Sequence, residues 1–307
     1  MLLYTTITSL ILSVFSYPIF YGNSVTIFNN AEAISSSPSP SSSASSPPCP
    51  PCVIFRIDDI SDSRPSATIA VMNLFIDENK PLTLGIVMNH IGRNQAVMEK
   101  ILEGKNKGLF ELALHGYEHV YYNKLSPQEQ LSQLTDANQR MHDLFGKPSN
   151  VFIPPYDVFN NYTIDAMSRL GIRIISAGDF MYPPSGNSQY YLFSINDTSK
   201  YNNSANESNN NQVYHMARST GIESFGETSQ PTKLSLGEIL NDTNYYISKL
   251  GYAVIVMHPT TFLVMQDGKY TNIVDENEIN FVKALINSLE SKNIHFTSFS
   301  KLAGIHP

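Results

Sequence analysis

The segment Val53-Ile-Phe-Arg-Ile-Asp-Asp59 shows the pattern that recurs along the chain, a strand followed by polar residues. The first five of these residues are apolar except Arg56, so they predict a short buried strand that runs into two adjacent carboxylates. Further strand-like segments alternate with segments of helical periodicity as far as residue 299, and the clearest helix start is Ser126-Pro-Gln-Glu129. Because strands that alternate with helices pair in parallel, the sequence predicts an α/β fold on a parallel sheet, open or closed.

Several residues with catalytic or metal-binding side chains follow predicted strands. In chain order they are Asp58 and Asp59, His115 and His119, Tyr156, Asp179, and His258. The carboxyl ends of parallel strands meet at one edge of a sheet, where α/β folds build their sites. We therefore expect these side chains to lie close together.

The segment His115-Gly-Tyr-Glu-His119 carries two imidazoles four residues apart. We interpret it as one helical turn, on which both rings face the same way and can share a metal ion. A neighbouring Asp would complete a site of two histidines and one carboxylate, with positions left for water and substrate. A zinc peptidase with an H-E-x-x-H helix is disfavoured, because Gly116 stands where the glutamate base belongs and a strand runs directly into His115.

The two adjacent carboxylates suit two different roles. Neighbouring side chains at a strand end point in different directions. One of them can ligate a metal while the other acts as a base toward the attacking water, and the metal itself lowers the pKa of water and polarises a carbonyl.

These segments resemble the motifs of the polysaccharide deacetylases of the NodB-homology type, carbohydrate esterase family four. Phe55-Arg-Ile-Asp-Asp59 is similar to their T-F-D-D-G motif, and His115-Gly-Tyr-Glu-His119 is similar to H-[ST]-x-x-H. Ile153-Pro-Pro-Tyr156 resembles R-x-P-[YF], and Val256-Met-His258 resembles L-x-H. The segments occur in the family's motif order between residues 53 and 299.

The resemblance implies a distorted (β/α) barrel with seven or eight strands and a divalent metal, with zinc as the expected ion. The implied metal ligands are Asp59, His115 and His119. The implied catalytic residues are Asp58 as general base, His258 as general acid, Tyr156 through its backbone N–H in an oxyanion hole, and Asp179 as the carboxylate that supports the catalytic histidine.

The chain departs from the family pattern at three positions. Gly116 replaces a serine or threonine, Ile60 replaces the glycine after the Asp pair, and Ile153 replaces the arginine that orients the base. Arg56 or Arg218 could replace that arginine, and the sequence alone leaves both open.

Together these features predict a metal-dependent carbohydrate deacetylase, a hydrolase that removes N- or O-acetyl groups from a polysaccharide or glycoconjugate. The alternative is a catalytically impaired carbohydrate-binding protein of the cell surface on the same fold. Binding alone needs neither Asp58 nor His258, which favours the enzyme, whereas Ile153 favours the alternative.

Composition and the N-terminal segment predict where the protein works. The net charge of −7 argues against nucleic-acid binding as the main function. Residues 1–33 open with an apolar stretch and predict a signal peptide or membrane anchor, and residues 34–52 form a Ser/Pro-rich linker. The catalytic domain is expected over 53–307, with an exposed Asn-rich insertion at about 196–212. We expect an extracytoplasmic protein, secreted or tethered to the membrane at the cell surface through its N-terminus.

Overall fold

The computed structural model of the 307-residue chain describes residues 51–178, 190–194, 212–225 and 231–305, all within the unit Ser45–Pro307. The predicted signal or anchor segment, almost all of the Ser/Pro-rich linker, Asp179, and residues 196–211 of the Asn-rich insertion lie outside these residues. Within the described ranges, no helix is long and apolar enough to cross a membrane.

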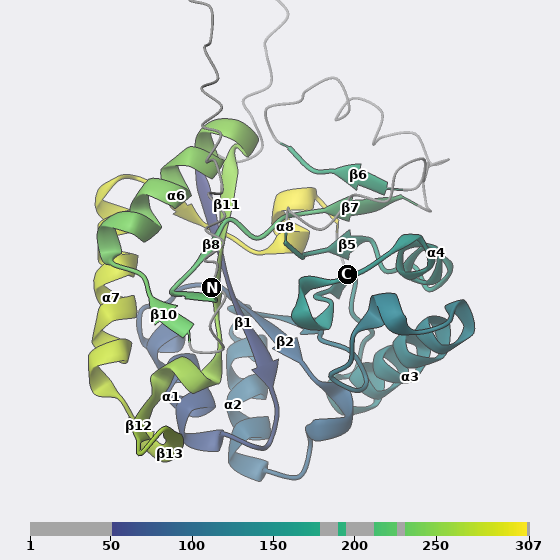
Figure 1. Cartoon of the computed structure of the whole chain (residues 1–307), viewed down its shortest axis with the longest axis horizontal. Helices are drawn as coiled ribbons and strands as arrows, with labels where there is room; N and C mark the ends of the chain where they lie inside the picture. Colours follow the sequence, from purple (N-terminus) through teal and green to yellow (C-terminus); the bar gives the residue numbers. More distant parts are fainter. Residues whose placement is uncertain (1–50, 179–189, 195–211, 226–230, 306–307) are drawn as a thin grey trace, which may run out of the picture. The chain divides into compact units, whose positions relative to one another are not determined.

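The main sheet is parallel throughout, which confirms the predicted α/β class and the distorted (β/α) barrel (Figure 1). Its strand order is β6-β7-β5-β4-β3-β2-β1-β11-β8, with β14 also paired to β1, and no pairing among the described residues joins β6 to β8. The strands are β1 (Cys52–Ile60), β2 (Leu82–Ile86), β3 (Phe110–Leu114), β4 (Val151–Phe152), β5 (Ile174–Ile175), β6 (Tyr190–Leu192), β7 (Val213–His215), β8 (Thr220–Gly221), β11 (Tyr252–Met257) and β14 (His295–Phe296). Two antiparallel pairs lie apart from this sheet, namely β9 (Glu223–Phe225) with β10 (Pro231–Lys233), and β12 (Leu263–Gln266) with β13 (Lys269–Val274).

Helices follow most of the strands, as the alternating pattern predicts. In Figure 1, α6, α7 and α1 lie to the left of the central strands, and α3 and α4 lie to the right. The helices are α1 (Pro65–Asp77), α2 (Gln95–Asn106), α3 (Pro127–Phe145), α4 (Asn161–Arg169), α6 (Leu236–Leu250), α7 (Glu276–Ser291) and α8 (Phe299–Ala303). Four short 3₁₀ turns complete the described structure: η1 (Met88–His90), η2 (Tyr122–Lys124), η3 (Pro155–Asp157) and η4 (Pro259–Phe262).

Local signals in the sequence set the helix boundaries. At the start of α3, the Ser126 hydroxyl accepts the N–H of Glu129, and the Glu129 carboxylate accepts the N–H of Ser126, so the predicted cap is confirmed. At the end of α6, Gly251 has a φ of 85°, a left-handed conformation that ends the helix.

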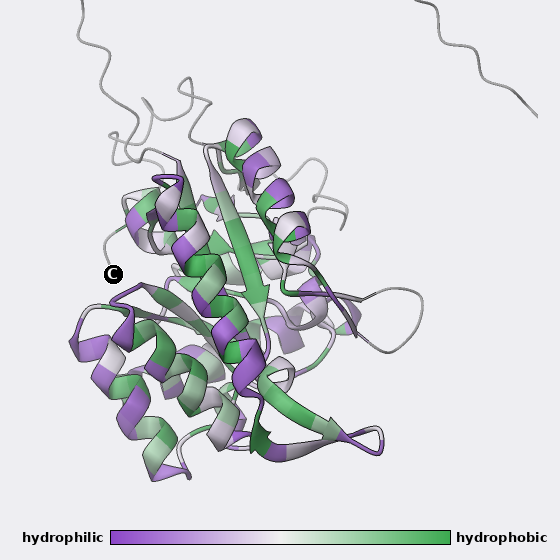
Figure 2. Ribbon diagram, turned by 90° about the vertical axis from the view of Figure 1, so that its left-hand side faces the viewer, coloured by the Kyte–Doolittle hydropathy of each residue, from purple (hydrophilic) through white to green (hydrophobic). Residues whose placement is uncertain are grey.

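The core is formed by strands that are buried on both faces. All six residues of β11 and the first seven of β1 are buried, as expected for parallel strands covered by helices. Figure 2 shows the long strand almost entirely apolar, whereas the helices in front of it carry polar and apolar residues on different faces. Arg56 is the exception, because its side chain is fully buried in the middle of β1. A buried charge requires partners, and those of Arg56 lie at the carboxyl edge of the sheet.

Candidate metal and catalytic site

Asp58 and Asp59 lie within β1, which continues three residues beyond the predicted strand and ends at Ile60. The register of β1 against β2 shifts between Ile57 and Ile60, and Asp59 has a φ of 59°. Such an irregularity re-aims neighbouring side chains. Asp58 is therefore buried, with 3% of its surface exposed, whereas the side chain of Asp59 is 35% exposed at the rim of the sheet.

His115 directly follows β3, as predicted, but the predicted helical turn from His115 to His119 is wrong. The segment is an irregular bend in which Gly116 has a φ of 81°. A Cβ atom at Gly116 would lie 2.5 Å from the carbonyl oxygen of Glu118. The bend nevertheless brings the two imidazole rings together, with their centroids 5.0 Å apart.

Asp59, His115 and His119 form a compact cluster of potential metal ligands. Asp59 Oδ1 lies 3.2 Å from His115 Nε2 and 3.0 Å from His119 Nε2, and one ligand atom from each residue falls within 4.8 Å of the others. The other ring nitrogen of His115, Nδ1, lies 2.8 Å from the carbonyl oxygen of Ile153. With Nδ1–H donating to that carbonyl, Nε2 is the nitrogen that remains for a metal. This donor set fits a divalent ion such as zinc.

The charges within this cluster reinforce one another. Burial opposes ionisation of Asp59, but the hydrogen bonds from His115 and His119 hold its pKa well below the usual range. Burial likewise opposes the charged form of His115, while its hydrogen bond to Asp59 raises its pKa.

A second, buried cluster lies beside the first and is centred on Arg56. One guanidinium nitrogen of Arg56 donates to Asp58 Oδ2 at 3.0 Å and to Asp157 Oδ1 at 2.7 Å, and the other donates to the carbonyl and hydroxyl oxygens of Ser176, both at 2.8 Å. Asp157 Oδ2 also pairs with Arg218 at 3.1 Å. Of the two arginines that the sequence left open, Arg56 is the one that donates to Asp58.

Tyr156 lies in η3, between the two clusters, with a left-handed backbone (φ 60°). Its ring stacks on Tyr121 with centroids 3.8 Å apart and meets the ring of His119 edge-on at 4.6 Å. Both tyrosines are partly exposed, 48% for Tyr156 and 41% for Tyr121. They form a flat aromatic surface at the edge of the metal-ligand cluster.

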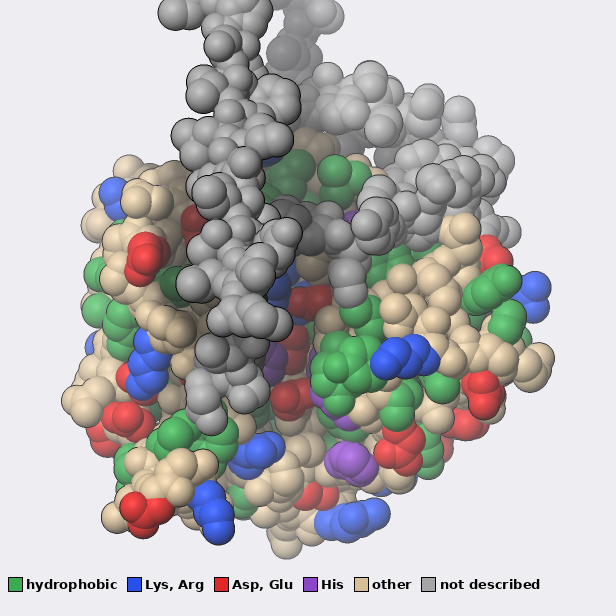
Figure 3. Space-filling view, in the orientation of Figure 1, with side chains coloured by type: hydrophobic (Ala, Val, Ile, Leu, Met, Phe, Trp, Pro, Cys, Tyr) green, Lys and Arg blue, Asp and Glu red, His purple; other side chains and the backbone are tan. Residues whose placement is uncertain are grey.

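His258 directly follows β11, as predicted. Because Ile57 of β1 pairs with Met257 of β11, Asp58 and His258 follow paired residues and lie at the same level of the sheet. His258 also lines a narrow crevice with Arg218 and Glu223. Figure 3 shows acidic, basic and histidine side chains side by side in the middle of this face.

The structure thus brings together six of the seven predicted residues at one edge of the sheet, and the seventh, Asp179, lies outside the described residues. Asp157 and Ser176 are functional partners that the sequence motifs do not predict. The sequence signal for such partners is Arg56 itself. An arginine inside an apolar strand becomes buried on folding, so its charge requires nearby carboxylates and hydrogen-bond acceptors.

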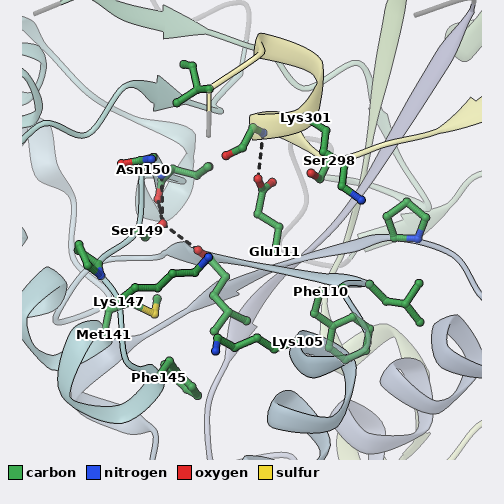
Figure 4. Close-up of a pocket in the computed structure, with 18 residues that line it drawn as sticks. Lys105, Phe110, Glu111, Met141, Phe145, Lys147, Ser149, Asn150, Ser298 and Lys301 are labelled. Atoms are coloured by element: carbon green, nitrogen blue, oxygen red, sulfur yellow. Dashed lines mark hydrogen bonds between the residues drawn. The ribbon is translucent and has the colours of Figure 1, made fainter. Parts of the chain in front are cut away.

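A cavity of about 290 Å³ at the opposite end of β3 is a separate feature (Figure 4). It is lined by apolar residues such as Phe110, Met141 and Phe145 and by Lys105, Lys147 and Lys301. Phe110 begins β3 and His115 follows its other end, so at about 3.3 Å per residue the cavity lies roughly 16 Å from the histidine cluster. The cavity is therefore separate from the residues at the carboxyl edge.

The fold and the carboxyl-edge residues define a class of protein, an α/β barrel with two histidines and one aspartate at its strand ends. Residues 45–175 match the family model described as polysaccharide deacetylase. Over this segment, 131 of the 307 residues, the chain is similar to the polysaccharide deacetylase family. A search of curated protein sequences finds no match.

Solved structures of a putative polysaccharide deacetylase and of family 4 carbohydrate esterases share the fold at low sequence identity. A putative polysaccharide deacetylase from Mycobacterium smegmatis is 13% identical, with a TM-score of 0.57 over 83% of this chain and 90% of that chain. A family 4 acetyl xylan esterase from Clostridium thermocellum, in complex with a cobalt ion, is 14% identical, with a TM-score of 0.51 over 83% and 91%. A mutant of a family 4 pseudoenzyme from Bacillus anthracis is 12% identical, with a TM-score of 0.51 over 83% and 68%. At these identities the comparison establishes the fold.

Proposed function

We propose that the chain is a metal-dependent hydrolase that removes N- or O-acetyl groups from a polysaccharide or glycoconjugate. The observation that carries the proposal is the state of Asp58. Its Oδ2 accepts a hydrogen bond from Arg56, whereas its Oδ1 is buried and has no hydrogen-bond partner among the described residues. A Cβ atom at Gly85 would lie 3.1 Å from this oxygen, so glycine keeps the space beside it open. A buried acceptor without a donor costs stability, and its presence beside the metal-ligand cluster supports a role in proton transfer.

Asp59, His115 and His119 would hold a divalent ion, for which we propose zinc. Two imidazole nitrogens and one carboxylate suit zinc and leave positions open for other ligands. The bond between the His115 ring and the Ile153 carbonyl supports this assignment, because it orients the ring for metal binding. A bound ion would supply a Lewis acid that polarises the substrate carbonyl and lowers the pKa of water.

The remaining residues would handle protons and charge. Asp58 would accept a proton from the attacking water through its free oxygen, and the backbone N–H of Tyr156 would donate to the developing oxyanion. His258 would protonate the leaving amine or alkoxide, so that the products are acetate and a deacetylated sugar. We retain the proposal that Asp179 supports His258.

The proposed partner is an extracytoplasmic polysaccharide or glycoconjugate, and no nucleic acid is proposed. The apolar segment at 1–33 and the linker at 34–52 support secretion or anchoring at the cell surface. The exposed pair of Tyr121 and Tyr156 beside His119 supports binding of a sugar ring at the edge of the cluster.

The replacement of the motif arginine by Ile153 was the reason to consider a catalytically impaired binding protein. The bond from Arg56 to Asp58 removes most of that reason, because the base still has a buried cation beside it. The enzyme is therefore the function that we propose.

The test measures acetate release by zinc-loaded protein from chitooligosaccharides, which carry N-acetyl groups, and from acetylated xylan, which carries O-acetyl groups. We expect release from at least one of them. Asp58→Asn is the matched control, because it preserves the size of the side chain and all three proposed ligands. It should lower turnover by about 10²–10⁴-fold with zinc content unchanged. Zinc-loaded wild type that binds these glycans and releases no acetate would support the binding protein instead.

A further inference from the structure

We infer that Arg56 is a positioning residue that fixes the base Asp58 and the Tyr156–Asp157 turn in one arrangement. The inference rests on the proposed function. Arg56 is fully buried in β1, and its guanidinium bonds to groups at three strand ends. These groups are Asp58 at the end of β1, Asp157 after β4 and Ser176 after β5.

The geometry of the guanidinium links these strand ends rigidly. One terminal nitrogen, Nη2, donates to both Asp58 Oδ2 and Asp157 Oδ1, and the other terminal nitrogen, Nη1, donates twice to Ser176. A guanidinium is a planar fork of fixed donors, so the two carboxylates cannot shift independently of each other. A lysine ammonium at this position keeps the charge and loses the fork.

The formal charges in this cluster are equal in number. Asp58 and Asp157 face Arg56 and Arg218, two negative and two positive groups. Burial disfavours the charged form of Arg56, but Asp58 and Asp157 raise its pKa. Burial opposes ionisation of Asp157, but Arg56 and Arg218 lower its pKa.

The turn that Asp157 anchors is strained. Tyr156 and Asp157 have φ values of 60° and 57°, a left-handed conformation that is unfavourable for residues other than glycine. Such a turn persists only where its surroundings determine it. Both oxygens of the Asp157 carboxylate are held, one by Arg56 and the other by Arg218. The N–H of Tyr156, the proposed oxyanion donor, belongs to this turn, so Arg56 ties the base to the oxyanion site.

At position 153, the backbone carbonyl takes part in the site and the isoleucine side chain supplies no charge to it. The carbonyl oxygen of Ile153 accepts a hydrogen bond from the ring N–H of His115. The apolar Cδ1 of Ile153 and Oδ1 of Asp58 both border the space that a Cβ atom at Gly85 would fill. The cation that orients the base therefore comes from β1.

The test compares Arg56→Lys and Asp157→Asn with a matched control, Arg173→Lys. Arg173 is a partly buried arginine that donates to the carbonyl of Gln212. The substrate is 4-nitrophenyl acetate, whose good leaving group needs no proton from His258, so its turnover reports on the base and the oxyanion site. We expect kcat to fall about 10–100-fold in Arg56→Lys and in Asp157→Asn, with KM within about twofold and zinc content unchanged. Arg173→Lys should match the wild type.

A double-mutant cycle separates positioning from a purely structural role. If Arg56 acts through Asp58, Arg56→Lys should lower turnover by a smaller factor in an Asp58→Asn background than in the wild type. Equal factors in both backgrounds would overturn the inference. Wild-type turnover in Asp58→Asn alone would instead refute the proposed function, because the base would then lie elsewhere.

A second readout does not depend on activity. Hydrogen–deuterium exchange at residues 151–160 should be faster in Arg56→Lys and in Asp157→Asn than in the wild type, because the strained turn loses an anchor. Arg173→Lys should leave this segment unchanged. Asp157→Asn keeps the shape of the side chain and covers the case in which Arg56→Lys does not fold. Unchanged exchange in this segment in every variant that folds would reject the role of Arg56 in holding the turn.

Discussion

Replacing Gly116 by serine restores the residue type of the family motif H-[ST]-x-x-H, and it should nevertheless damage the proposed metal site. Gly116 has a φ of 81°, and a Cβ atom there would lie 2.5 Å from the carbonyl oxygen of Glu118. A Cβ atom is fixed to the backbone, and the carbonyl oxygen is part of it, so a side-chain rotation cannot separate them. The backbone of the bend between His115 and His119 must therefore move. The two imidazoles would then no longer meet Asp59 together.

The size of the effect follows from the backbone conformation. A left-handed conformation costs a residue other than glycine about 1–2 kcal/mol. In Gly116→Ser, binding both histidines to one ion would return the bend to its present conformation and bring the new Cβ atom back against the carbonyl oxygen of Glu118. We therefore expect a free-energy cost of about the same size to oppose metal binding. At about 1.4 kcal/mol per tenfold change, zinc affinity should fall roughly 5–30-fold.

The assay is zinc affinity by competition with a chromogenic chelator, together with the free energy of unfolding in urea. Gly108→Ser is the matched control, because Gly108 has a φ of 70° and a Cβ atom there would have no neighbour within 4 Å. Both variants should lose stability, and only Gly116→Ser should lose zinc affinity. If Gly116→Ser binds zinc as tightly as Gly108→Ser, the argument from the bend is wrong.

Three further predictions address other parts of the chain. His258→Ala should slow turnover more on acetylated xylan than on 4-nitrophenyl acetate, because only the sugar alkoxide needs a proton; equal losses on both, with zinc retained, would argue against an acid role. Removal of residues 1–50 should leave a cooperatively melting domain that retains Pro51, whose carbonyl accepts the N–H of His295; aggregation would contradict this. Burial would raise the pKa of Asp157, but Arg56 and Arg218 hold it below its usual value, so this carboxylate stabilises the fold above about pH 4 and loses that effect as the pH falls. Urea unfolding between pH 3 and 7 should therefore depend less on pH in Asp157→Asn than in the wild type, and an equal dependence would exclude the effect.

Much of the fold and of the residue cluster could be predicted because both depend on local pattern and chain order. The strand at 53–57 and the helix after Ser126 follow from apolar periodicity and from a capping box. Once the strands are parallel, their carboxyl ends meet at one edge, so Asp59 in β1 and His115 directly after β3 could be expected at the same edge without any knowledge of the distances.

The bend from His115 to His119 could not be predicted in the same way. A spacing of four residues suits a helical turn, but it also suits a bend that folds back on itself. The difference lies in the backbone at Gly116, whose left-handed conformation glycine adopts freely. The choice between the two depends on packing against the neighbouring strands, which the local sequence does not contain.

The partners of Arg56 are set by contacts far apart in the chain, since Asp157 and Ser176 lie 101 and 120 residues beyond it. Their presence bears on whether the chemistry is intact. A buried ion pair is often no more stabilising than apolar side chains of similar volume, and replacing one with such side chains commonly leaves stability unchanged or raises it. A chain that used this fold only for binding would therefore lose little stability by replacing Arg56 and Asp58 with apolar residues. This chain has isoleucine at position 153 and still buries Asp58 with one carboxylate oxygen hydrogen-bonded to Arg56 and the other left for a proton. That combination favours the proposed role of Asp58 as a base over a role in the stability of the sheet.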